Sequence, residues 1–214
     1  MTLRKTLLAL AAATALTACG SIGGPKIAIK VYDPETQVRV DPSWPQVDWS
    51  LTVGTTAGIE ALDSVRIAVR PTPHELQAYK GAAWADTAPD LLRAALVEAF
   101  EDSGKIAAVG RWGGGTGGER SDFSLVLEVR AFETDYGRGA PEAVIEVQAR
   151  LNHRRGEGFA TRRFRQAVAG TSPQIPDMVA AFGEALSALS TDVVGWTLTE
   201  GEKLRNEERG TRNP

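Results

Sequence analysis

The sequence contains few of the side chains that metal proteins and hydrolases depend on. Its 214 residues include one cysteine and two histidines, His74 and His153. One cysteine cannot form an internal disulfide or a cysteine-rich zinc site, and neither histidine belongs to a His-x-x-x-His pair. The Gly-x-Ser-x-Gly motif that positions many hydrolase nucleophiles is also absent. The sequence therefore predicts a protein that is not an enzyme and carries no metal or cofactor.

Excess positive charge and long apolar runs are missing as well. The net charge is -3 at pH 7, which is not typical of nucleic-acid binders. No stretch approaches the roughly 20 apolar residues of a membrane-spanning helix. The glycine-rich stretch at residues 113–118 is followed by Glu119 and Arg120, whereas a phosphate-binding loop continues with Lys and then Ser or Thr. We therefore interpret it as a mobile loop and not as a nucleotide site.

The N-terminus has the features of an export signal that ends at the cysteine. Arg4 and Lys5 precede an uncharged run of Leu, Ala and Thr at residues 7–18, too short to span a membrane. Cys19 follows directly, behind small residues, and the segment resembles a bacterial lipobox. That resemblance implies cleavage before Cys19 and attachment of acyl chains such as palmitate. An ordinary signal peptide with a chance cysteine is the alternative.

The rest of the chain predicts a single α+β domain, an antiparallel sheet with two helices packed on one face. Alternating apolar residues predict strands, and two apolar stripes at helical spacing predict helices. The expected strands cover residues 49–53, 65–69, 106–109, 123–130, 145–152 and 159–168, and the expected helices cover 87–103 and 176–198. Strands 123–130 and 145–152 should form an antiparallel hairpin. We expect a signal peptide at 1–18, a lipidated flexible tether at 19–31, the folded domain at 32–201 and a disordered polar tail at 202–214.

Several segments, taken in order, resemble one known family. The matching segments are residues 45–49 (PQVDW), 62–71 (LDSVRIAVRP), 84–86 (WAD), 89–92 (PDLL), 99–104 (AFEDSG), 121–123 (SDF) and 192–198 (DVVGWTL). Together with the lipobox, they are similar to the ABC-type transport auxiliary lipoproteins, the PqiC-like group that accompanies MCE-domain lipid transporters. The resemblance extends over about residues 32–201. One departure is Ala83, where relatives often have arginine.

The resemblance implies a function that the residue pattern alone does not show. The protein would be an outer-membrane lipoprotein facing the periplasm, held by acyl chains on Cys19; Gly20 follows, where aspartate would favour the inner membrane. It would act as a non-catalytic docking component for the MCE-domain protein of an ABC transporter that moves phospholipids or other hydrophobic compounds between membranes. A lipid carrier with an acyl-chain cavity between helices and sheet is the alternative. Homo-oligomers are compatible with either function.

Two sets of residues are candidate contact sites. Tyr79 and Trp84 flank the first helix, where they either contact a partner or close one end of the core. A second set of arginines clusters in one predicted hairpin and comprises Arg150, Arg154, Arg155, Arg162 and Arg163. These arginines either bind an anionic surface or simply keep an edge of the sheet solvated, with Glu146 and Glu157 offsetting part of their charge.

Overall fold

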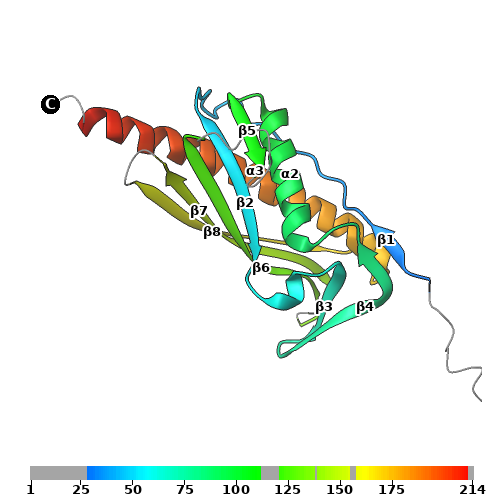
Figure 1. Ribbon diagram of the computed structural model, residues 1–214. Helices are drawn as coiled ribbons and strands as arrows, with labels where there is room; N and C mark the ends of the chain where they lie inside the picture. Colours follow the sequence, from blue (N-terminus) through cyan, green and yellow to red (C-terminus); the bar gives the residue numbers. More distant parts are fainter. Residues whose placement is uncertain (1–27, 112–120, 138, 155–157, 212–214) are drawn as a thin grey trace, which may run out of the picture.

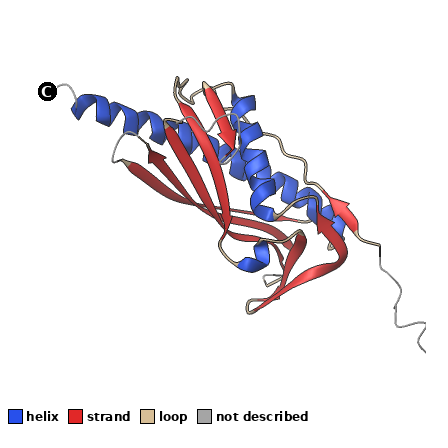
Figure 2. Cartoon of the chain, viewed as in Figure 1, coloured by secondary structure: helices blue, strands red, loops and turns tan. Residues whose placement is uncertain are grey.

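The computed structural model describes residues 28–111, 121–137, 139–154 and 158–211. Cys19 and the glycine-rich stretch at 113–118 lie outside these ranges. Within them the chain forms one α+β domain, with two long helices on one face of a sheet (Figures 1 and 2). The elements are β1 (Lys30–Tyr32), β2 (Ser50–Ala57), the short 3-10 helix η2 (Glu60–Leu62), β3 (Arg66–Thr72), β4 (Glu75–Trp84), α2 (Ala88–Ser103), β5 (Ala108–Arg111), β6 (Phe123–Asp135), β7 (Glu142–His153), β8 (Phe159–Ala169) and α3 (Ile175–Thr211).

Strand β6 is the centre of the sheet. Strand β7 pairs along one edge of it in the predicted antiparallel hairpin, with Leu127 opposite Ala149, and β8 continues the sheet beyond β7. Strands β2 and β3 share the other edge, each parallel to a different half of β6. The register shifts between Val129 and Ala131, where β6 changes from one partner to the other. This register shift, a β-bulge, lets the long strand β6 pair with both β2 and β3 along the same edge.

The prediction of an antiparallel sheet holds for the long hairpins, but the sheet as a whole is mixed. Strand β2 is parallel to both β5 and β6, and the short β1 is parallel to β4. Strands β1 and β4 were not predicted. Strand β4 lacks a regular alternation of buried and exposed residues and contains Gly81 with a φ of 74°. Because neither face of β4 is consistently buried, its sequence carries no strong period of two.

Helix α2 begins and ends as its sequence predicts. Thr87 is the N-cap, and its side chain accepts a hydrogen bond from the backbone N–H of Asp90 at 3.3 Å. Pro89 occupies the first turn, where a missing N–H costs nothing. Gly104 ends the helix with a φ of 60°, a conformation that favours glycine. Local sequence chemistry is therefore sufficient to define both ends of this element.

Aromatic rings fill the interface between the helices and the sheet. Trp84 from β4 meets Phe132 from β6 and Phe182 from α3, with ring centroids 5.6 and 5.1 Å away. Phe132 and Phe182 stack on each other at 5.1 Å. Trp49 packs on Phe123 at 4.6 Å towards the other end of the sheet. Burial of these large rings contributes much of the hydrophobic stabilisation of the domain.

Helix α3 is longer than predicted. It continues to Thr211, so the prediction of a disordered tail is wrong for residues 202–211; residues 212–214 lie outside the described part. Arg205 forms ion pairs with Asp48 and, within its own helix, Glu202, and His153 Nδ1 lies 3.1 Å from Glu208 Oε2. These contacts anchor a segment whose polar composition alone indicated disorder.

Helix α3 is also the one described helix that is long and apolar enough to cross a membrane. Only its length and composition meet this criterion, and 61% of its most apolar 18-residue stretch is buried inside the fold. The helix packs along β7 and β8 and against α2. Its apolar residues are therefore those of a core helix.

Gly201 of α3 is required by the close approach of Trp49. A Cβ at this position would lie 2.6 Å from Trp49 Cζ2, and Trp49 is itself buried. Gly201→Ala should lower the free energy of unfolding, because overpacking costs about 1–3 kcal/mol against a helix-propensity gain of about 1 kcal/mol. Gly210→Ala is the matched control, since a Cβ there meets nothing within 4 Å. Urea unfolding of both variants tests this; equal stability of the two would contradict it.

Candidate interaction surface

The predicted arginine cluster is divided by the alternation of the strands. Successive side chains of β8 point to opposite faces of the sheet. Arg162 shares the helix-covered face with Phe164, and its guanidinium lies 5.0 Å from that ring. Arg163 points to the open face, as does Arg150 of β7. The five arginines therefore do not form one continuous patch in the described structure; Arg154 is exposed after β7, and Arg155 lies outside the described residues.

Part of the positive charge on the open face is compensated. Arg163 donates two hydrogen bonds to Oε1 of Glu146, at 3.0 and 2.5 Å. Arg165 lies 3.7 Å from the other oxygen of the same carboxylate. The expected offset by Glu146 is confirmed, whereas Glu157 lies outside the described residues. Arg150 instead stacks 4.4 Å from the ring of Phe159.

Tyr79 and Trp84, the two aromatic candidates, have different environments. Trp84 is only 2% exposed and packs in the aromatic core, which confirms the core alternative for this residue; the prediction of a partner contact is wrong for it. Tyr79 is partly buried on β4, and its hydroxyl hydrogen-bonds the hydroxyl of Tyr136 at 3.0 Å. Sequence alone placed both residues beside the first helix because it did not identify β4 as a strand. Tyr79 stays a predicted partner contact.

Burial raises the pKa of Tyr79 to about 12; the nearby hydroxyls of Thr134, which lowers it, and of Tyr136, which raises it, have smaller effects. Below the ordinary value of 10.0, the phenol keeps its proton in both the folded and unfolded chain. Between pH 10.0 and about 12 the unfolded chain releases this proton while the folded chain retains it, so stability falls as pH rises. Tyr79→Phe should lose this part of the pH dependence. Urea unfolding at several pH values tests it; identical slopes for both proteins would contradict it.

An extended segment that sequence analysis missed lies along α3. We call residues 33–45 the strap. Its backbone is held by hydroxyl groups of the helix: the N–H of Gln37 donates to Ser187 Oγ at 2.9 Å, and the N–H of Arg39 donates to Thr191 Oγ1 at 3.1 Å. Each hydroxyl in turn donates to the helix carbonyl four residues earlier. The spacing of Ser187 and Thr191 by one helical turn therefore positions alternate residues of the strap.

Small residues of α3 allow the strap to approach closely. A Cβ at Gly183 would lie 2.6 Å from the carbonyl oxygen of Glu35, and a Cβ at Gly195 would lie 2.6 Å from Trp44 Nε1. Gly183, Ser187, Thr191 and Gly195 follow one another at intervals of four residues and so lie on one face of the helix. This repeat of small and hydroxyl residues was the sequence signal for the strap.

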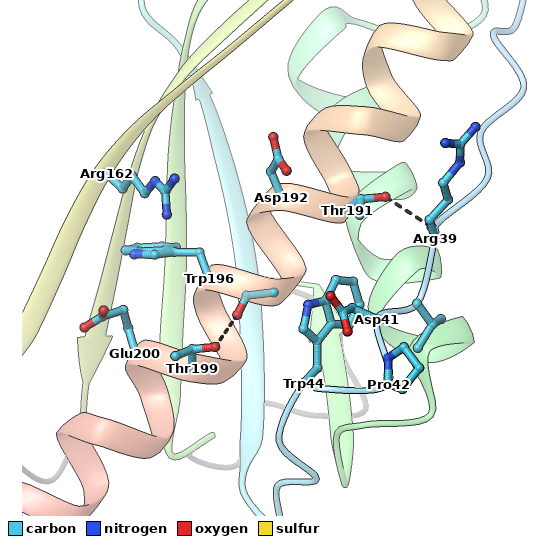
Figure 3. Close-up of a pocket in the computed structure, with 12 residues that line it drawn as sticks. Arg39, Asp41, Pro42, Trp44, Arg162, Thr191, Asp192, Trp196, Thr199 and Glu200 are labelled. Atoms are coloured by element: carbon cyan, nitrogen blue, oxygen red, sulfur yellow. Dashed lines mark hydrogen bonds between the residues drawn. The ribbon is translucent and has the colours of Figure 1, made fainter.

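A surface groove runs along α3 between the strap and β8. It consists of two adjoining depressions, of about 1080 and 760 Å³, that share Arg39, Thr191 and Asp192. Figure 3 shows the second one, with Arg39 and Trp44 on the strap side and Arg162 on the β8 side of Trp196. We call the whole depression the strap groove. Its floor is the exposed flank of α3, with Ala180 and Ala188 between charged residues.

In the described part of the chain, side chains fill the interface between the helices and the sheet. Leu125, Leu127 and Val129 of β6 face the helices and are fully buried, as are Phe182 and Leu189 of α3. These side chains occupy the interface where the acyl-chain cavity was expected. The described residues therefore give no support to the carrier alternative. They also contain no group of three or more His, Cys, Asp or Glu side chains that could hold a metal ion.

Together these features define the described part of the chain as a small α+β module with a filled core and an open groove on its surface. Among solved structures, protein XCC0632 of Xanthomonas campestris is 44% identical to this chain, with a TM-score of 0.75 over 81% of this chain and 98% of that one. A second solved structure, 16% identical with a TM-score of 0.58, covers 78% of this chain and 97% of its own and supports the fold alone.

The chain belongs to the family of ABC-type transport auxiliary lipoprotein components, whose family model matches residues 31–194. The resemblance found in the sequence is confirmed. The chain is also 26% identical over 179 residues to the protein bll6063 of Bradyrhizobium diazoefficiens. That match covers 82% of this chain and 47% of the relative, so the chain spans about half the length of this curated relative.

Proposed function

We propose that the protein is a non-catalytic docking component, anchored in the outer membrane and facing the periplasm, of an ABC transporter with an MCE-domain protein. In this function it supports the movement of phospholipids or other hydrophobic compounds between membranes. The family match over residues 31–194 is the observation that carries the proposal. The resemblance to a lipobox that ends at Cys19 agrees with it, because a lipid anchor would hold the domain at the membrane, close to a transporter.

The geometry of the described residues agrees with docking rather than with chemistry or carriage. The core is filled by side chains, and the open surface of the module is a groove lined by backbone, small residues and charges. Such a surface suits an extended partner better than an enclosed small molecule. Tyr79 and the exposed arginines stay candidates for further contacts, and assembly of several copies stays a prediction.

Affinity purification from membranes tests the proposal. The lipidated full-length chain with a C-terminal tag, solubilised in mild detergent, should recover an MCE-domain protein together with the subunits of its ABC transporter. An unrelated lipoprotein with the same tag and anchor is the control for mere co-residence in the membrane. Quantitative mass spectrometry that finds transporter subunits equally abundant in both samples would contradict the proposal.

A further inference from the structure

The outer edge of β8 is open in the described structure. Strand β8 pairs with β7 on one side, and no other described strand pairs with it. The N–H of His153 donates to the carbonyl of Gly158 at one end of the ladder, and the N–H of Gly170 donates to the carbonyl of Pro141 at the other. The register between these ends is unbroken. Even-numbered residues of β8 therefore point their backbone groups at β7, and odd-numbered residues such as Arg163 and Ala167 point theirs outward.

This open edge and the strap groove run side by side. Gly158 lies beside Leu204, Gln166 donates to Asp192 at 2.7 Å, and Gly170 lies beside Met178, so β8 and α3 run in opposite directions. The stretch from residue 158 to 170 of an extended strand measures about 40 Å. The helix from residue 178 to 204 measures about 39 Å. A polypeptide added to the edge of β8 would thus follow α3 between about Met178 and Leu204.

The flank of α3 below that edge is acidic. Glu184, Asp192 and Glu200 lie eight residues apart, all of them at least partly exposed, and we call them the acidic ridge. The strap adds Asp33, Glu35 and Asp41, so that six carboxylates and two arginines, Arg39 and Arg162, line the groove. Of the six, Glu200 is also paired with Lys203, at 3.7 Å. Successive ridge residues are about 12 Å apart along the helix axis, and each is turned by about 80° about that axis from the one before. The ridge therefore winds around α3 along the groove and is not a straight row of carboxylates.

We infer that the strap groove binds an extended, basic segment of a partner protein, which pairs with β8 as an additional strand. Its lysine or arginine side chains meet the carboxylates that line the groove. The inference rests on the proposed docking function and names the surface that performs it. The open backbone edge supplies affinity, and the charges select the register and exclude acidic sequences.

Charge distinguishes this occupant from the two alternatives. A second copy paired edge to edge through β8 would place its own acidic ridge beside Glu184, Asp192 and Glu200, which is repulsive. An anionic lipid headgroup would meet the same carboxylates. A cationic polypeptide is the occupant whose charge complements the groove.

A synthetic peptide tests the inference on the full-length protein in detergent. The probe is a fluorescent peptide of about twelve residues, with lysine at every fourth position and threonine and valine elsewhere. It should bind, with an affinity that falls as salt rises, whereas the same peptide with glutamate for lysine should not. N-methylation of alternate backbone amides should abolish binding, since it removes the donors that pair with β8. Equal anisotropy changes for the lysine and glutamate peptides would overturn the inference.

Variants of the protein test the two halves of the surface separately. Glu184→Lys with Glu200→Lys should weaken peptide binding about tenfold or more, whereas Glu98→Lys with Glu101→Lys, the same change of charge on exposed residues of α2, should not. Ala167→Pro removes an outward N–H without touching the β7 ladder and should also weaken binding, and Ala167→Thr should not. Unchanged binding to folded Ala167→Pro would overturn the inference; if that variant fails to fold, the N-methylated peptide decides.

Two further results separate this inference from the proposed function. If the wild-type chain forms dimers in detergent that Ala167→Pro converts to monomers, the occupant is a second copy and the inference fails. If tagged Ala167→Pro and Glu184→Lys/Glu200→Lys still recover the transporter subunits as well as wild type, the docking function stands and this surface is not where it occurs. Loss of transporter subunits from these variants, but not from Glu98→Lys/Glu101→Lys, supports the inference.

Discussion

Trp84→Ala should strongly destabilise the fold and lower the free energy of unfolding by about 3–5 kcal/mol. The indole is 2% exposed and lies edge-on to both Phe132 and Phe182. Its removal leaves a cavity among three elements, β4, β6 and α3, that cannot all collapse inward at once. Urea unfolding followed by tryptophan fluorescence and circular dichroism measures the loss.

Trp44→Ala is the matched control for this prediction. Trp44 lies on the strap against Gly195 and remains partly exposed, so its truncation removes less buried area. Its effect on stability should be clearly smaller, since the hydrophobic contribution scales with the area removed from water. A Trp84→Ala protein that is as stable as wild type but has lost partner binding would contradict the prediction and make Trp84 a contact residue.

Cys19→Ser should release the protein from the membrane. Each acyl methylene buried in a bilayer contributes about 0.8 kcal/mol, and durable attachment needs two or more chains. A serine cannot form the thioether that would carry the acyl chains. Fractionation of cells, followed by a carbonate wash and immunoblotting, should find the variant in the soluble fraction and the wild type in the membrane fraction.

Ser21→Ala is the control, because it changes the tether beside the cysteine without touching the thiol. It should remain in the membrane fraction. Retention of Cys19→Ser in the washed membrane fraction would mean that another part of the chain holds the membrane. Helix α3 is the candidate among the described elements, although most of its most apolar 18-residue stretch is buried in the fold.

The sequence predicts those elements whose ends and faces are determined locally. Thr87, Pro89 and Gly104 define α2 without help from the rest of the fold, and strict alternation over residues 123–130 and 145–152 defines the central hairpin. Strand β4 has no such alternation over most of its length, because none of its residues before Ala82 is buried. The end of α3 depends on Asp48 and His153, which are distant in sequence. The hydrophobic periodicity of a sequence does not report contacts between residues that are distant along the chain.

The interaction surface was less predictable than the fold for the same reason. The arginines of residues 150–163 are close in sequence, but strand alternation sends Arg162 and Arg163 to opposite faces. The groove, in contrast, is assembled from the strap, β8 and α3, which only the fold brings together. A repeat of Glu184, Asp192 and Glu200 at intervals of eight residues is visible in the sequence. The sequence does not show that these carboxylates lie beside the open edge of β8, and the inferred binding of a basic segment depends on that contact.

Photo-cross-linking in living cells tests the central claim, that this lipoprotein docks an ABC transporter at the membrane, most directly. A photoreactive amino acid in place of Ala167, in the otherwise intact lipidated chain, samples whatever lies against the open edge. We expect an adduct with the MCE-domain protein of the transporter, and no such adduct when the probe replaces Glu101 on α2. Adducts confined to other copies of this chain, or none with any transporter component from either position, would contradict it.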